Sequence, residues 1–253
     1  MMMKRLVTAG LAVAILAAVP GVAVAQEAPA RPTNEQEVTR ADRGAQWVDA
    51  LKSRALEAIE KRLVTIGELE AAINRSETVE ADHAAQLLNE LRASAAGLEA
   101  LAGEIRAAED LETLWALVPK IFEDYRIYAV VAPKVHLVLG ADHAGSVADR
   151  IKNAAGSLGE ALDSLDEAGF DVADGEKLLA EMERLIAAGA EQAGSIPGMV
   201  LGLTPADYPG SSETLRSAQS VLQSGTEDLR AAGQTAHEIV RFILSVLAGD
   251  STE

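Results

Sequence analysis

The sequence predicts an all-α protein, built as an elongated antiparallel helical bundle. Apolar residues recur at intervals of three and four over most of residues 38–248, which is the repeat of an amphipathic helix. Aromatic residues make up 3% of the chain, so few of the side chains that favour strands are present. Cysteine is absent, so no disulfide can form and stability must come from packing.

Residues 1–25 have the layout of a secretory signal peptide. Lys4 and Arg5 form a short basic region, an apolar stretch follows, and the small residues Ala23 and Ala25 precede the expected cleavage site. Because there is no cysteine, a lipid anchor at that site is excluded. An uncleaved membrane anchor is the alternative. The sequence therefore predicts a secreted or extracytoplasmic protein of the cell envelope.

A tether and two helices are expected next. Residues 26–37, QEAPARPTNEQE, contain two prolines and little that could be buried, which predicts a flexible tether. Helices are predicted over 38–75 and 79–107, with Ser76 and Thr78 as candidate N-caps of the second. The unbroken three-four spacing of the second is typical of a coiled coil or narrow bundle; it is carried by Leu88, Leu91, Ala95, Leu98, Ala102 and Ile105.

The third predicted helix, 110–166, contains the least polar stretch of the chain after the N-terminus. Between residues 127 and 140 only Lys134 and His136 are charged or titratable, and the stretch is too short to span a bilayer. A buried strand is disfavoured, because both flanks are helical and no partner strand is evident. Pro133 lacks a backbone donor, so we expect the helix to be interrupted there. The segment is predicted to be buried on all sides, as the packing junction of the molecule.

Two further helices complete the chain, over 172–195 and 211–248. Asp171 and Asp174 are candidate caps of the first of them. The loop between the two helices is rich in proline and glycine, and in it Thr204 and Asp207 flank Pro205 in a capping-box pattern. Alanine and glycine occupy four of the ten apolar positions in 211–248, which predicts close approach of neighbouring helices; these positions are Leu215, Ala218, Leu222, Gly225, Leu229, Ala232, Ala236, Ile239, Ile243 and Val246.

Short connections between these helices predict antiparallel neighbours. Residues 38–132 and 133–248 can each form a three-helix module, followed by a tail at 249–253. The modules would share one helix kinked at Pro133, which is a spectrin-like layout by analogy only. A single compact bundle of five or six helices is the alternative.

The charge of the chain restricts its partners. Its 22 basic and 39 acidic residues give a net charge of −17, and removal of 1–25 takes two basic residues and leaves about −19. Such a surface repels phosphate, so we expect no nucleic acid and no direct binding to anionic membranes. An unknown protein or envelope component is the expected partner, and the oligomeric state is left open.

The sequence offers little for metal binding. Glu80 and His83 match the Glu-x-x-His spacing of carboxylate-bridged metal sites, but no second copy exists. His136 and His143 are seven residues apart and are the remaining candidate ligands, because they would share a helix face. No carboxylate triad or cysteine joins them, so we expect one core and one exposed histidine, no metal and no cofactor. The acidic loop around Gly175 does not fit a calcium loop.

No catalytic motif is found either. Neither a nucleophile elbow, a Ser-x-x-Lys pair nor a phosphate loop is present, so a non-enzymatic protein is predicted. The aromatic side chains are expected to pack in the core or at helix ends rather than to form a ligand cage; they are Trp47, Trp115, Tyr125 and Tyr128.

Two stretches carry a resemblance to a family. DYRIYAVVAPKVHLVLGAD at 124–142 and LGLTPADYPG at 201–210 resemble a pattern in uncharacterised secreted all-helical proteins of actinobacteria. The resemblance implies a secreted all-helical fold and brings no activity or site residue with it.

Together these observations predict a secreted or envelope-associated, non-enzymatic helical interaction or structural protein with an acidic surface. The alternative is a helical bundle that binds a small apolar ligand or a metal ion between its helices.

Overall fold

The structure, a computed structural model, describes the backbone of residues 34–249 and the side chains of residues 42–248. The predicted signal peptide, most of the predicted tether and residues 250–253 of the tail lie outside the described residues. The chain divides into two units, Met1–Asp42 and Arg43–Glu253. Of the first unit only the opening residues of a helix are described, and everything below concerns the second.

Five long helices account for most of the described chain, which confirms the prediction of an all-α helical bundle. No strand occurs within residues 34–249. The long helices are α1 (Asn34–Arg75), α2 (Ala81–Ala107), α5 (Ala132–Glu167), α6 (Ala173–Val200) and α7 (Ser211–Gly249). The short elements are α3 (Leu111–Leu117), α4 (Lys120–Glu123), the π-helical turn η1 (Ile127–Val131) and the 3-10 turn η2 (Pro205–Asp207).

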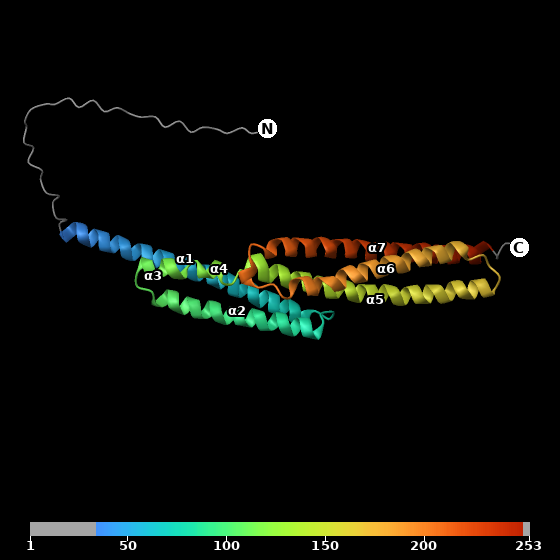
Figure 1. The fold of residues 1–253 in the computed structure, drawn as a ribbon, viewed down its shortest axis with the longest axis horizontal. Coiled ribbons are helices and arrows are strands. Elements are labelled where there is room, and N and C mark those ends of the chain that lie inside the picture. The colour runs from blue at the N-terminus through green and yellow to red at the C-terminus, as the bar shows by residue number, and fades with distance from the viewer. Residues whose placement is uncertain (1–33, 250–253) are drawn as a thin grey trace, which may run out of the picture. The chain divides into compact units, whose positions relative to one another are not determined.

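The helices α5, α6 and α7 run side by side and enclose one core (Figure 1). Much of this core is alanine, which lets the helices approach closely; examples are Ala148, Ala193 and Ala232. The helices approach closely at Gly189 of α6 and Gly225 of α7, where an added Cβ on Gly189 would lie 2.9 Å from the carbonyl oxygen of Gly225. The close helix approach predicted from the small residues of 211–248 is therefore found here.

A second core lies where α1 and α2 run alongside each other (Figure 1). Ile59 and Leu91 are fully buried in it, and the side chain of Lys52 on α1 donates to the carbonyl oxygen of Arg106 on α2. The opening turns of α5, the end of α6 and the start of α7 also enter this core. Leu222 on α7 packs against both cores, so the two are contiguous.

The interruption expected at Pro133 lies earlier in the chain. The backbone leaves the helical conformation at Arg126, which has a φ of +43°, and Pro133 lies in the first turn of α5. Just before it, η1 is wound as a π-helix, with Ala132 donating to the carbonyl oxygen of Ile127. This wider turn accommodates a residue that cannot donate a backbone hydrogen bond and whose ring would clash in a regular α-helix. Proline thus widens this helix at its start rather than kinking it midway.

The segment 127–140 is largely but not wholly buried. Val131, Val135 and Val138 are at most 1% exposed, as the three-four spacing predicts. Tyr128, however, is 52% exposed, and His136 also faces solvent. The prediction of burial on every side is wrong for these two residues. Arg62 lies over the ring of Tyr128, 5.1 Å from its centroid, but covers it only in part.

Helix ends are fixed by side-chain oxygens at several places. Asp110 accepts from the backbone N–H of Thr113 and so caps α3. Thr204 and Asp207 form the predicted capping box, which opens the single turn η2. Within residues 34–249, no helix combines the length and the apolar character needed to cross a bilayer.

Candidate functional site

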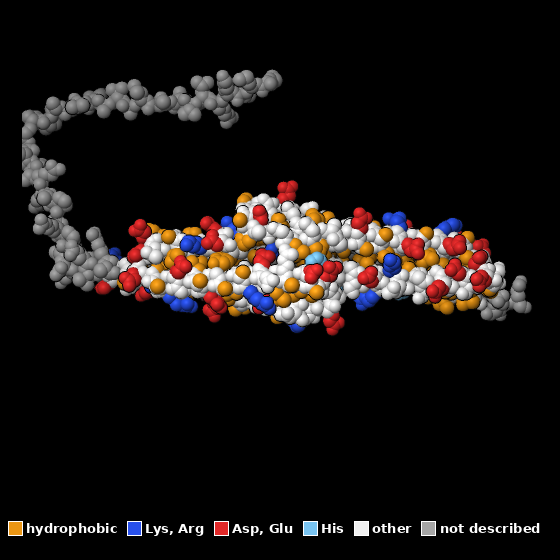
Figure 2. Space-filling view, turned by 60° about the horizontal axis from the view of Figure 1, so that its bottom comes forward, with side chains coloured by type: hydrophobic (Ala, Val, Ile, Leu, Met, Phe, Trp, Pro, Cys, Tyr) orange, Lys and Arg blue, Asp and Glu red, His pale blue; other side chains and the backbone are white. Residues whose placement is uncertain are grey.

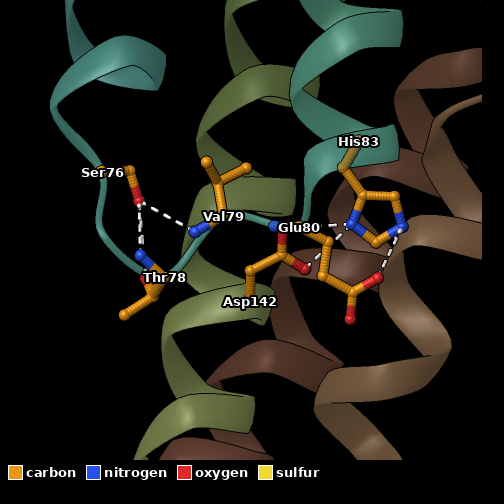
Figure 3. A network of polar contacts seen from close by, with 6 residues as sticks. All are labelled: Ser76, Thr78, Val79, Glu80, His83 and Asp142. Carbon is orange, nitrogen blue, oxygen red and sulfur yellow. Dashed lines mark hydrogen bonds and ion pairs between the residues drawn. The ribbon is translucent and has the colours of Figure 1, made fainter.

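A polar cluster joins the start of α2 to the N-terminal part of α5. It consists of Glu80, the N-cap residue of α2, of His83 in the first turn of α2 and of Asp142 from α5, and we call it the carboxylate–histidine cluster (Figure 3). The turn before it is held by Ser76, whose hydroxyl accepts from the backbone N–H of Val79 at 3.2 Å. Ser76 was expected to cap the helix itself, but α2 begins only at Ala81.

Asp142 caps the start of α2 from across the interface. Its Oδ2 atom accepts at 3.0 Å from the backbone N–H of Glu80, the N-cap residue, which is the donor that the N3 side chain satisfies in a capping box. Its carboxylate also lies 3.0 Å, through Oδ1, from Nδ1 of His83. The far ring nitrogen of His83, Nε2, lies 3.8 Å from Oε2 of Glu80. The imidazole is thus flanked by a carboxylate on each side.

Burial differs sharply among the three side chains. The side chain of Asp142 is 4% exposed, that of His83 18% and that of Glu80 70%. The cluster opens into a hollow of about 680 Å³, whose other walls come from α5 and from the glycine-rich end of α6. A small molecule or ion can therefore reach the buried carboxylate from solvent through this hollow.

The two histidines singled out from the sequence are not brought together. His136 and His143 are both exposed on α5, and they line two separate hollows, one with Arg216 and one with Arg230. Asp142 was missed, although the spacing of Val135, Val138 and Asp142 places it on the buried face of α5. This spacing could have identified Asp142 from the sequence, because an acidic side chain on a buried helix face needs a polar partner.

A second buried charge lies near the start of α5. Lys134 is 1% exposed, and its ammonium donates to Oε2 of Glu90 on α2 and, at 2.6 Å, to the carbonyl oxygen of Leu203. These contacts hold the loop after α6 against α2 and α5. Because the ammonium meets two protein acceptors that join α5 to α2 and to the loop after α6, we assign the pair a structural role.

The other notable feature is an exposed aromatic surface. Trp47 on α1 and Trp115 on α3 are 67% and 66% exposed, so neither packs in the core, which is one of the two places expected for them. They border a shallow hollow of about 450 Å³. We call this the tryptophan surface; its lining residues are Trp47, Ala50, Leu51, Arg54, Leu111 and Trp115.

Acidic residues flank the tryptophan surface. Asp110 and Glu112 stand on either side of Leu111 and are exposed. Hydrogen bonds from the backbone and then the hydroxyl of Thr113 hold the pKa of Asp110 below its ordinary value, so this carboxylate stays charged. Elsewhere too, acidic side chains are scattered along the face drawn in Figure 2, with basic and hydrophobic side chains between them.

In comparisons with known proteins, the chain matches no protein-family model, no curated protein and no solved structure.

Proposed function

We propose that the protein is an exported, non-enzymatic helical interaction protein that binds a protein partner of the cell envelope through the tryptophan surface. The observation that carries this proposal is the exposure of Trp47 and Trp115, both about two-thirds open to solvent and side by side on one hollow. Large aromatic side chains of this kind dominate the binding energy of many protein interfaces. An exposed apolar patch also carries a cost in solubility, which binding would offset.

The charge around the tryptophan surface defines the partner further. Asp110 and Glu112 border the surface and Arg54 is the basic residue in its lining, while the chain as a whole carries a net charge of −17. Charges at the rim of an interface select partners of opposite sign and speed association. The proposed partner is therefore a basic protein that places an aliphatic or aromatic side chain between the two tryptophans. Nucleic acid and anionic lipid are disfavoured by the same charge.

Site-specific photocrosslinking in the producing cell tests this proposal. A photoreactive amino acid at position 47 or 115 should give an adduct with one protein partner, and the same group at Glu227, exposed on α7, should not. The yield of the adduct should fall as salt is raised, because salt screens the attraction between the charges at the rim and those of the partner. Failure to form an adduct at 47 and 115, or equal labelling from position 227, would remove the support for this surface.

A further inference from the structure

The geometry points to a zinc-binding site formed by Glu80, His83 and Asp142, with its open coordination position facing the hollow beside α6. The three residues offer one imidazole nitrogen and two carboxylate oxygens, and their ligand atoms lie within 4.8 Å of one another. This inference departs from the sequence-based expectation of no metal, because the Glu-x-x-His spacing of α2 gains its third ligand from a helix 59 residues further along the chain.

The distances within the carboxylate–histidine cluster suit a single metal ion. Zinc binds nitrogen and oxygen ligands at about 2.0 to 2.2 Å, so two ligands of a tetrahedral zinc ion lie about 3.3 to 3.6 Å apart. Nδ1 of His83 and Oδ1 of Asp142 are 3.0 Å apart, so they would have to separate by only a few tenths of an ångström to hold an ion between them. A zinc ion between them would take the place of the contact between these two atoms. Oε2 of Glu80 lies beside Nε2, the other ring nitrogen, so this mostly exposed side chain has to turn for its carboxylate to reach the same ion.

The surroundings of Asp142 give independent support. Its side chain is 4% exposed, and its ion pair in the described part of the chain is with His83. A buried carboxylate needs partners that make up for its lost hydration. The backbone N–H of Glu80 donates to Oδ2 and so orients the carboxylate, whose two oxygens lie 3.0 and 3.1 Å from Nδ1 of His83. The site is thus oriented by its neighbours in the way that metal ligands usually are.

The ligand set favours zinc over the hard cations. Magnesium and calcium take oxygen ligands, whereas imidazole is a ligand of zinc and other transition metals. Three protein ligands leave at least one position for water or for a ligand group, and the hollow of about 680 Å³ provides the space for it. Bound zinc would clamp the start of α2 to α5 at a place distinct from the tryptophan surface.

Calorimetric titration of the chelator-treated protein with Zn²⁺ alone tests the site. We expect one equivalent to bind, and thermal unfolding to shift upward with zinc concentration. His83→Ala should weaken binding at least about tenfold. Glu80→Gln should weaken it as well without changing stability in the absence of metal, because its side chain is exposed and its backbone N–H still reaches Asp142.

Matched controls separate this site from adventitious binding. His136→Ala and His143→Ala remove exposed histidines of α5 that lie outside the cluster and should keep the affinity of the unaltered protein. If His83→Ala does not fold, Glu80→Gln decides, since it leaves the capping of α2 intact. The inference is overturned if the unaltered protein binds no zinc, if Glu80→Gln binds it undiminished, or if calcium binds more tightly than zinc.

Discussion

On the buried face of α5, Val138 and Asp142 lie about one helical turn apart. Both side chains are almost inaccessible to solvent, yet only the carboxylate needs a hydrogen-bonding partner. Asp142 finds two, the backbone N–H of Glu80 and the ring of His83. The carboxylate of Asp142 can be buried in α5 because the start of α2 supplies hydrogen-bonding partners for it.

Val135 occupies the same face two turns earlier and lacks such donors. It is fully buried among the apolar side chains of the core shared by α1, α2 and α5. Val135→Asp should therefore reduce the free energy of unfolding by several kcal/mol, on the order of 4, because an unpaired charge would enter the core. Chemical denaturation monitored by circular dichroism measures this loss.

The control for Val135→Asp is Glu227→Ala, on the exposed face of α7. This change should alter the free energy of unfolding by no more than about 0.5 kcal/mol. If Val135→Asp left stability unchanged but abolished binding of a partner, the segment around it would be a docking surface instead of a core.

At the scale of elements, the sequence predicted the ends of helices well wherever a local signal marked them. Four of the five expected helices match to within a few residues, except that α6 continues through Pro197 to Val200. The third expected helix, 110–166, does not match. It is divided into shorter elements, and the last division depends on the left-handed backbone of Arg126 and on the π-turn before Pro133. Neither feature has a reliable signature in a single sequence, since arginine rarely adopts that conformation.

The packing of α6 against α7 depends on glycine at one point of contact. Gly189→Ala should destabilise the protein by about 1 to 3 kcal/mol, because the added methyl group would meet the carbonyl oxygen of Gly225 at 2.9 Å and Leu229 at 2.7 Å. Gly194→Ala on the same helix is the matched control. No atom lies within 4 Å of its added Cβ, so it should stabilise the helix by up to about 1 kcal/mol. Equal midpoints of urea unfolding for the two variants would contradict this account.

For the whole molecule, the sequence predicted architecture better than sites. Helical periodicity and capping are local, whereas the carboxylate–histidine cluster joins residues 59 positions apart and could be found only after α2 and α5 had been placed together. The exposure of the two tryptophans was likewise unpredictable, because a tryptophan at a helical position has the same pattern whether a neighbour covers it or not. The charge of the chain, by contrast, is a property of composition and restricts partners without any structure.

Export is the last prediction, and it concerns the chain as a whole. Residues 1–25 carry two basic and no acidic residues, so their removal would change the net charge from −17 to about −19 and leave a chain that begins at Gln26. Intact-mass analysis of protein recovered outside the cytoplasm should show the loss of 25 residues. Replacing both Ala23 and Ala25 by arginine should block cleavage, because signal peptidase sites require small residues there, and should retain the chain at the membrane. A mature product of the unaltered chain that still contained Lys4 and Arg5 would instead mean that the apolar stretch is a permanent anchor.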